Sequence, residues 1–87
     1  MFFAYLLRCA DGTLYAGSTH DLAARAARHN QGRGGRYTAG RRPVSIVYSE
    51  AFESQALAMA RERALKQLDR AEKEALVSGA PQTGPGR

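Results

Sequence analysis

An Asp-Gly pair near the start of the chain, Asp11-Gly12, most constrains how this sequence can fold. It separates two apolar, β-prone runs, which cover residues 2–9 and 14–17. Such a pair between apolar runs is a strong short-range signal for a tight turn between two antiparallel strands. The chain therefore begins with a predicted β-hairpin.

A helix, a loop and a third strand are predicted after the hairpin. Asp21 is placed to cap a helix over residues 22–30. A glycine- and arginine-rich loop follows at 31–36 and leads to Pro43. Residues 44–52 alternate well enough to form a strand, with its apolar positions at Val44, Ile46 and Tyr48.

Two further helices are predicted in the last third of the chain. Ser54 is placed to cap a long helix that continues through Leu68. Asp69 and Glu72 have the spacing of a capping box, which predicts a short last helix to about Val77. The apolar stripe of the long helix is expected at Leu57, Ala60, Ala64, Leu65 and Leu68.

The 87 residues are expected to form a single domain of the α/β (α+β) class. The predicted element order is β-β-α-β-α-α, which makes a small three-stranded antiparallel or mixed sheet flanked by helices. We expect the domain to cover residues 1–77. The Gly and Pro content of residues 78–87 indicates a flexible C-terminal tail.

The single cysteine, Cys9, leaves no partner for an internal disulfide and fits a reducing compartment. We expect its side chain to fill the core. The longest apolar run covers residues 2–7, far below the roughly 18 residues that a transmembrane helix needs. It also lacks the basic flank of a signal peptide. The sequence therefore predicts a soluble, cytoplasmic protein with no membrane partner.

The net charge of +5 is concentrated in the middle of the chain. Residues 22–49 contain no acidic side chain, and every charged residue in this stretch is an arginine. Guanidinium groups match phosphate geometry with two hydrogen bonds, so a segment of this kind predicts a phosphate-binding surface. Arginine bias in a GC-rich coding sequence is the alternative explanation.

Five short motifs follow one another in an order that resembles a known nuclease superfamily. They are Phe3-Ala4-Tyr5, Tyr15-Ala16-Gly17, Asp21–Arg25 with Arg28-His29-Asn30, the loop that ends in Tyr37-Thr38, and Arg61-Glu62 with Leu65-Lys66. In this order they resemble the GIY-YIG nuclease superfamily, in particular its compact single-domain bacterial branch. The resemblance extends from about Phe3 to Val77.

This resemblance implies a metal-dependent endonuclease that hydrolyses phosphodiester bonds in DNA, in a repair or processing setting, with RNA left open as a substrate. The catalytic residues that it implies are Tyr5, Tyr15, Arg25 and His29. It also implies one Mg²⁺ or Mn²⁺ ion, held by Glu62 and weakly bound without substrate, because waters and substrate phosphates complete the shell of such an ion. Nucleic acid is expected to contact Arg28, Arg33, Arg36, Tyr37, Arg41, Arg42 and Lys66.

Tyr15 would accept a proton from the attacking water or hydrogen-bond to it. Tyrosine has an ordinary pKa of about 10, so its ionisation at neutral pH requires roughly 4 kcal/mol of stabilisation, which a metal ion and an arginine could supply. The alternative is that Tyr5 and Tyr15 are ordinary half-buried strand residues. An odd number of residues in the hairpin connection places both tyrosines on one face, and an even number separates them. The resemblance favours the odd register.

Each of the other site residues also has an alternative role. Arg25 would bind a non-bridging phosphate oxygen, or is an exposed helix residue. His29 would donate to a phosphate or move a proton, or it caps the end of its helix. Glu62 has Lys66 at i+4, so a surface ion pair is the alternative to a metal ligand. Gly17 is expected to permit a close approach of other atoms to the backbone.

Two other functions stay open from the sequence. One is a nucleic-acid-binding module with the same fold and little or no catalytic turnover. The other is an interaction domain that uses the arginine-rich loop against an acidic protein. The oligomeric state is not predicted.

Overall fold

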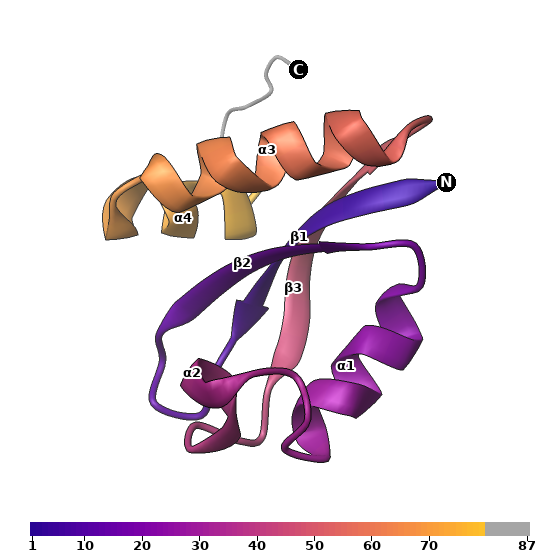
Figure 1. Ribbon diagram of the computed structural model, residues 1–87. Coiled ribbons are helices and arrows are strands. Elements are labelled where there is room, and N and C mark those ends of the chain that lie inside the picture. The colour runs from indigo at the N-terminus through magenta and orange to yellow at the C-terminus, as the bar shows by residue number, and fades with distance from the viewer. Residues whose placement is uncertain (80–87) are drawn as a thin grey trace.

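The computed structural model describes residues 1–79 and contains a three-stranded antiparallel sheet flanked by helices (Figure 1). The strands lie in the order β2-β1-β3. In chain order the elements are β1 (Phe2–Arg8), β2 (Leu14–Thr19), α1 (Leu22–Asn30), α2 (Arg36–Ala39), β3 (Ser45–Phe52), α3 (Gln55–Gln67) and α4 (Arg70–Val77).

The predicted fold class and the predicted element order are confirmed, with one addition. The short helix α2 lies in the segment that was expected to be a loop. The predicted flexible tail begins at residue 78, and its residues 80–87 lie outside the described residues.

The register of the hairpin places both of its tyrosines on one face of the sheet. Arg8 pairs with Leu14, so the connection consists of residues 9–13, which is an odd number. Tyr15 stands opposite Leu7, and Leu7 shares its face with Tyr5 two residues away. The odd register expected from the sequence is therefore confirmed.

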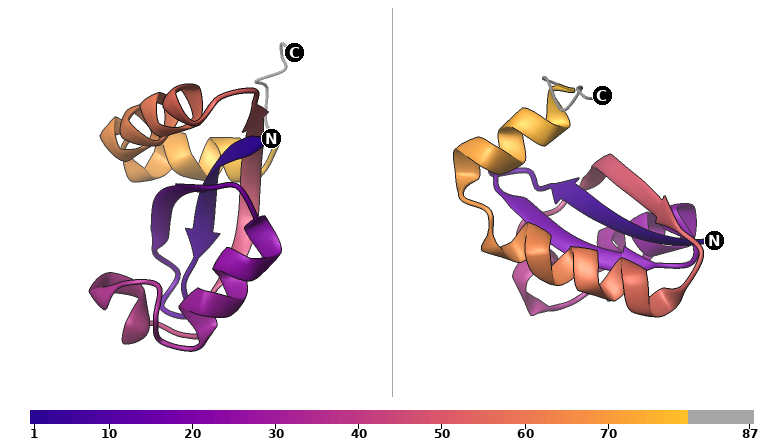
Figure 2. Two further views of the ribbon diagram at one scale, coloured as in Figure 1. Left: turned by 45° about the vertical axis from the view of Figure 1, so that its right-hand side comes forward. Right: turned by 90° about the horizontal axis from the view of Figure 1, so that it is seen from above.

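Each face of the sheet covers its own hydrophobic cluster. On one face α3 and α4 pack over Ala4, Leu6 and Ala16, with Leu65 of α3 fully buried among them. The opposite face buries a second cluster that reaches α1, made up of Tyr5, Leu7, Cys9 and Val44 with Tyr15, Leu22 and Ile46 packed against it. Figures 1 and 2 show α3 and α4 together on one side of the strands and α1 on the other.

The alternation predicted for the third strand is wrong in one respect. Leu6 pairs with Tyr48 and Leu7 pairs with Ile46, so Val47 is an extra residue in a β-bulge. Ile46 packs with the Tyr5 cluster, whereas Val47 and Tyr48 pack with the Ala4 cluster. The bulge therefore lets β3 supply apolar side chains to both cores.

Side chains cap the three longer helices as the sequence predicts. Asp21 accepts a hydrogen bond from the backbone N–H of Ala24, and Ser54 accepts one from Leu57. The capping box of α4 is complete: Asp69 accepts from the backbone N–H of Glu72, and Glu72 accepts from that of Asp69.

The apolar stripe predicted for α3 is wrong at three of its five positions. Leu57 is 56% exposed, and Ala60 and Ala64 are exposed, whereas Ala58 and Leu65 are buried. The face toward the sheet also carries Arg61 and Glu62, which bind polar side chains on β3 and β2. This helix packs by ion pairs and hydrogen bonds as well as by apolar contact, so hydrophobicity alone misplaces its buried face.

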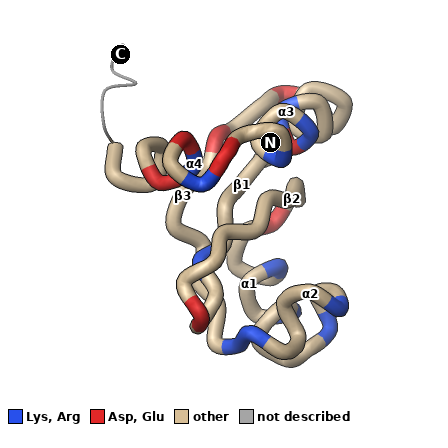
Figure 3. Tube along the Cα trace, turned by 90° about the vertical axis from the view of Figure 1, so that its left-hand side faces the viewer, with Lys and Arg blue, Asp and Glu red and all other residues tan. Residues whose placement is uncertain are grey.

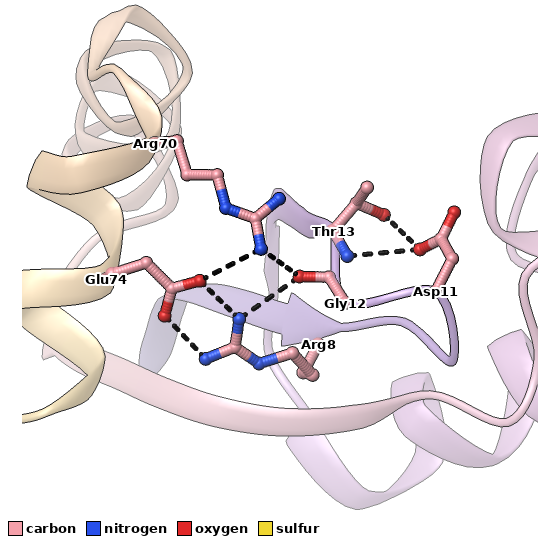
Figure 4. Close-up of polar contacts among 6 residues, drawn as sticks. All are labelled: Arg8, Asp11, Gly12, Thr13, Arg70 and Glu74. Carbon is pink, nitrogen blue, oxygen red and sulfur yellow. Dashed lines mark hydrogen bonds and ion pairs between the residues drawn. The ribbon is translucent and has the colours of Figure 1, made fainter.

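The last helix is joined to the hairpin by a cluster of charged groups (Figure 4). Arg8 of β1 donates to both carboxylate oxygens of Glu74, at 2.5 and 2.7 Å. Arg70 of α4 and Arg8 both donate to the carbonyl of Gly12 in the hairpin connection, at 3.0 and 3.2 Å. These contacts hold α4 beside the start of β2.

Cys9 is only 3% exposed and packs in the Tyr5 cluster, so the expected core role is confirmed. Its thiol is free. Among residues 1–79, no helix has the length and apolar character needed to cross a membrane.

Candidate active site

The predicted site residues come together along the outer edge of β2. Among the described strands β2 has only β1 as a neighbour, so its other edge is not paired. α3 packs against β2 on one face of the sheet, and the tyrosines lie on the other face together with α1. Groups from the two faces can therefore meet around this edge.

Tyr5 reaches the β2 edge from the central strand because Gly17 has no side chain. The two residues are paired in the hairpin, and a Cβ atom at Gly17 would stand 2.4 Å from the Tyr5 hydroxyl oxygen. The close approach predicted at Gly17 is thus confirmed. Burial raises the pKa of Tyr5, although the Arg25 guanidinium opposes the rise. The Tyr5 hydroxyl therefore keeps its proton at neutral pH.

His29 lies in the interior next to Tyr5 and has no exposed surface. Its Nδ1 atom is 2.8 Å from the Thr38 hydroxyl, and its Nε2 atom is 3.4 Å from the Tyr5 hydroxyl. The Thr38 hydroxyl also lies 3.4 Å from the carbonyl of Gly35, and the tautomer in which it donates there and accepts from Nδ1–H leaves Nε2 to accept from Tyr5. Burial, and after it the charges of Arg25 and Arg28, lowers the pKa of His29, which favours this neutral form.

The position of His29 excludes two of the three roles predicted for it, phosphate donation and helix capping, and leaves proton transfer as a prediction. A fully buried imidazole cannot donate to a phosphate from the surface. Its ring nitrogens bond to two side chains rather than to carbonyls at the end of α1, so it is not a helix cap either. Gly34 packs so closely on the ring that a Cβ there would stand 2.0 Å from Nδ1. The helix pattern gave no signal for this burial.

Tyr15 is half-buried and belongs to an aromatic stack at the same edge. Its ring lies edge-on to the His29 ring, with 5.8 Å between centroids. On the solvent side it stacks with Tyr37 of α2, at 5.5 Å and an interplanar angle of 21°. Arg41 places its guanidinium 4.0 Å from the centroid of the Tyr37 ring. The exposed ring of Tyr37 is therefore held against Tyr15.

Arg25 connects α1 to the C-terminal half of β2. Its guanidinium donates to the backbone carbonyl of Ser18 at 3.4 Å. Its charge also acts on Tyr5, His29 and Glu62. Arg25 is partly exposed and lines a hollow of about 100 Å³ that also contains Ser18 and His20.

Glu62 approaches the same edge from α3. Its Oε1 accepts from the Ser18 hydroxyl at 2.7 Å, and its Oε2 is 2.9 Å from the Lys66 ammonium. Although burial opposes ionisation, the hydrogen bonds from Ser18 and Lys66 and the charges of Lys66 and Arg25 lower the pKa of Glu62. The i,i+4 ion pair considered as an alternative is thus present, and the carboxylate faces the other site residues as well.

The donor set fits a single hard cation. Glu62 supplies an ionised oxygen donor whose side chain is 20% exposed, and Mg²⁺ is commonly held by one or two carboxylates together with waters and phosphate oxygens. Within residues 1–79, no cluster of three or more His, Cys, Asp or Glu side chains is placed to hold a metal. A cation at Glu62 would therefore depend on water and phosphate oxygens for most of its ligands.

Charge interactions connect the groups on the two sides of the β2 edge. Tyr5 interacts with Arg25, Tyr15 and Glu62, and Lys66 interacts with both Glu62 and Tyr15. Charge interactions thus link the two phenols to the guanidinium and the carboxylate. Ser18 is a further member that the sequence reasoning missed, although its position directly after Gly17 puts it on the face toward α3.

The predicted nucleic-acid-binding arginines divide into two groups. Arg41 pairs with Asp11 and donates to the carbonyl of Tyr37, and Arg42 donates to the carbonyls of Ala39 and Asn30. Arg28 donates to the carbonyl of Arg33. By contrast, no side-chain hydrogen bond or ion pair within the described residues engages the exposed Arg33 and Arg36 guanidinium groups. Figure 3 shows the segment from α1 through α2 with basic and no acidic positions.

The three-stranded sheet with helices on both faces and polar side chains gathered at the β2 edge defines a class of α+β domain. The family model of the GIY-YIG catalytic domain matches residues 1–75, so the chain belongs to the GIY-YIG family.

Its relatives form a narrower group. The chain is 50% identical over 76 residues to a UPF0213 protein of Halobacterium salinarum, an alignment that covers 87% of this chain and 99% of that protein. It is 49% identical over 82 residues to a UPF0213 protein of Natronomonas pharaonis, with 94% of each chain covered. The solution NMR structure of a UPF0213 protein from Bacillus halodurans is 42% identical and superposes with a TM-score of 0.56, covering 94% of this chain and 90% of that one.

Proposed function

We propose that this protein is a metal-dependent endonuclease that hydrolyses phosphodiester bonds in DNA at the free edge of β2. The observation that carries the proposal is the convergence of Tyr15, Arg25 and Glu62, which come from β2, α1 and α3. These three side chains all retain access to solvent. Family membership supports a nuclease, and the setting we propose is DNA repair or processing.

Arg25 is placed to bind a non-bridging oxygen of the scissile phosphate. Its guanidinium is permanently charged, and it stabilises the extra negative charge that develops as a fifth oxygen bonds to phosphorus. Lys66, 50% exposed beside Glu62, supplies a second positive charge at the same place. Tyr15 belongs to β2, the strand that borders the site. Its hydroxyl therefore hydrogen-bonds to the attacking water or accepts the proton of that water.

Glu62 is the residue that would hold a Mg²⁺ or Mn²⁺ ion. Such an ion, when bound, polarises a phosphoryl oxygen and lowers the pKa of its water. The lowered pKa of Glu62 keeps the carboxylate ionised at neutral pH, and Ser18 fixes the orientation of one of its oxygens at 2.7 Å. The Lys66 ammonium competes with a cation for the other oxygen, which is consistent with weak binding in the absence of DNA.

Tyr5 and His29 support the reacting groups from the interior and do not touch the substrate. Both are fully buried, and the hydrogen bond between them fixes the direction of the Tyr5 hydroxyl beside Arg25. We assign them as positioning residues, with Thr38 as the group that sets the tautomer of His29.

A binding module without turnover is the second candidate, and one contact favours it. Both carboxylate oxygens of Glu62 already have partners, Ser18 and Lys66. If that pair persists when DNA is bound, the carboxylate neutralises Lys66 and recruits no cation.

A cleavage assay distinguishes these functions. Supercoiled, branched, flapped and single-stranded DNA are incubated with Mg²⁺ or Mn²⁺, and nicked or shortened products are measured. We expect cleavage by the wild type, its loss in Glu62→Gln, and unchanged cleavage in the charge-matched control Glu53→Gln, whose side chain is exposed and does not line the hollow beside Arg25. Binding to DNA without cleavage under either ion would overturn the nuclease and support the binding module.

A further inference from the structure

The free edge of β2 is hollowed at both of its ends. At the Thr19 end lies the hollow of Arg25 and His20, and a larger one of about 440 Å³ continues along α1 to Arg28. At the Leu14 end lies a hollow of about 200 Å³ between α2 and α4. It is lined by Thr13, Leu14, Tyr37, Arg70 and Lys73.

We propose that the hollow at the Leu14 end is a second phosphate-binding subsite, in which Lys73 of α4 contacts the nucleic acid backbone on the far side of Tyr15 from Arg25. The inference rests on the proposed function and extends it, because it gives the direction in which a strand crosses the site. Neither Lys73 nor α4 belongs to the basic segment that the sequence singles out.

The first argument for the subsite is that the acidic side chains nearby already have partners. Glu74 is held by Arg8 and Arg70, and Asp11 is held by Thr13 and Arg41. The cap pair Asp69 and Glu72 bonds to backbone N–H groups at the start of α4.

No hydrogen bond or ion pair within the described residues engages the Lys73 ammonium, although its helix carries two carboxylates, Glu72 and Glu74. Its charge is therefore not neutralised locally, and it faces a hollow. Such an unpaired, partly exposed cation beside an open surface is suited to an anionic ligand.

The second argument is the continuity of the surface with the active site. Tyr37 forms one wall of this hollow and also stacks on Tyr15. Leu14 lies directly before Tyr15 on the strand. A backbone that leaves the Tyr15 hydroxyl toward the start of β2 therefore enters the hollow between Tyr37 and Lys73.

The third argument is the length of the edge. Leu14 to Thr19 spans five steps of about 3.3 Å, or about 17 Å. A B-form strand advances about 3.4 Å per nucleotide, so this edge is about five nucleotides long. Phosphate contacts at its two ends would place the scissile bond between them, and contacts with phosphates set the register of a strand without reading its sequence.

Binding is measured with the Glu62→Gln protein without divalent ions, so that the result does not depend on cleavage. The probes are a fluorescein-labelled single strand and the corresponding duplex, titrated by anisotropy at several salt concentrations. Lys73→Ala is compared with Arg63→Ala, which removes one equal charge from an exposed position of α3 that lines none of these hollows. Thermal unfolding of both variants reports whether the fold is kept.

We expect Lys73→Ala to weaken binding severalfold and to reduce the log–log salt slope by about 0.9 on duplex, or about 0.7 on a single strand. Lys73→Arg should restore most of the affinity, and Arg63→Ala should change the slope by much less. Equal effects of the two alanine variants would overturn the subsite and leave the nuclease proposal intact. If the wild type does not cleave DNA but Lys73→Ala still weakens binding as expected, the nuclease proposal is overturned and the subsite is kept.

Discussion

The hydroxyl oxygen of Tyr5 lies so close to the backbone of Gly17 that a single methyl group at Gly17 would stand 2.4 Å from it. Non-bonded carbon and oxygen atoms do not approach to this distance without a shift of one of them. The absence of a side chain at Gly17 therefore allows the Tyr5 phenol to lie beside the edge strand, where the charge of Arg25 acts on it.

Gly17→Ala tests this relationship directly. We expect a loss of about 1–3 kcal/mol in the free energy of unfolding, since the added methyl group overpacks a fully buried tyrosine, and a large loss of cleavage. Urea unfolding and the cleavage assay measure the two effects. Gly40→Ala is the matched control, because a Cβ at Gly40 meets no atom within 4 Å and its φ of −90° suits alanine. Equal stabilities of the two variants would contradict the packing argument.

Removal of the Arg25 guanidinium should affect chemistry more than binding. We expect Arg25→Ala to reduce the cleavage rate by a factor on the order of 10² or more, as for other groups that stabilise transition-state charge. Arg25→Lys should recover only part of the rate, because an ammonium does not reproduce the two-pronged contact with phosphate. Single-turnover rates at saturating protein separate this effect from affinity. A decrease below about threefold would remove Arg25 from the site.

The lowered pKa of buried His29 predicts a loss of stability in mild acid. Its pKa is about 6.5 in the unfolded chain and lower in the folded one, so the unfolded state binds more protons between these two values. Stability is therefore complete above about pH 6.5 and falls as the pH decreases toward the folded pKa. Urea unfolding at pH 7.5 and 5.5 measures the change.

A histidine comparison assigns this pH dependence. His29→Gln should remove most of the slope above pH 5.5, and His20→Gln, at an exposed position, should retain it. The lowered pKa of Glu62 acts in a more acidic range, because carboxylates with depressed pKa values lose their contribution only below their ordinary range. A slope that survives in His29→Gln would show that another group causes it.

The arginines of residues 22–49, the segment without acidic side chains, should separate into binding and structural residues. Arg36→Ala is expected to lower DNA affinity and the salt slope with little change in melting temperature, because its guanidinium has no partner within residues 1–79. Arg42→Ala should instead lower the melting temperature, since Arg42 donates to carbonyls of Ala39 and Asn30. Anisotropy and thermal unfolding, run on both variants, check the division. The opposite pattern would mean that the free-standing arginine is not a phosphate contact.

Several features were predictable because residues close in the sequence determine them. Asp11-Gly12 produced the hairpin, and Asp21, Ser54 and Asp69 each cap a helix through a backbone N–H three residues ahead. These interactions form within a few residues, so a pattern of letters is enough to locate them.

The tertiary structure alone decided the features that join distant segments. The bulge at Val47, the burial of His29 against Tyr5 and Thr38, and the polar inner face of α3 depend on which elements pack together. Residues 18 and 62 meet through the fold and not through any local spacing. The sequence by itself thus determined the elements and the chemical groups available, and the packing of α1 and α3 around the edge of β2 determined that these groups share one site.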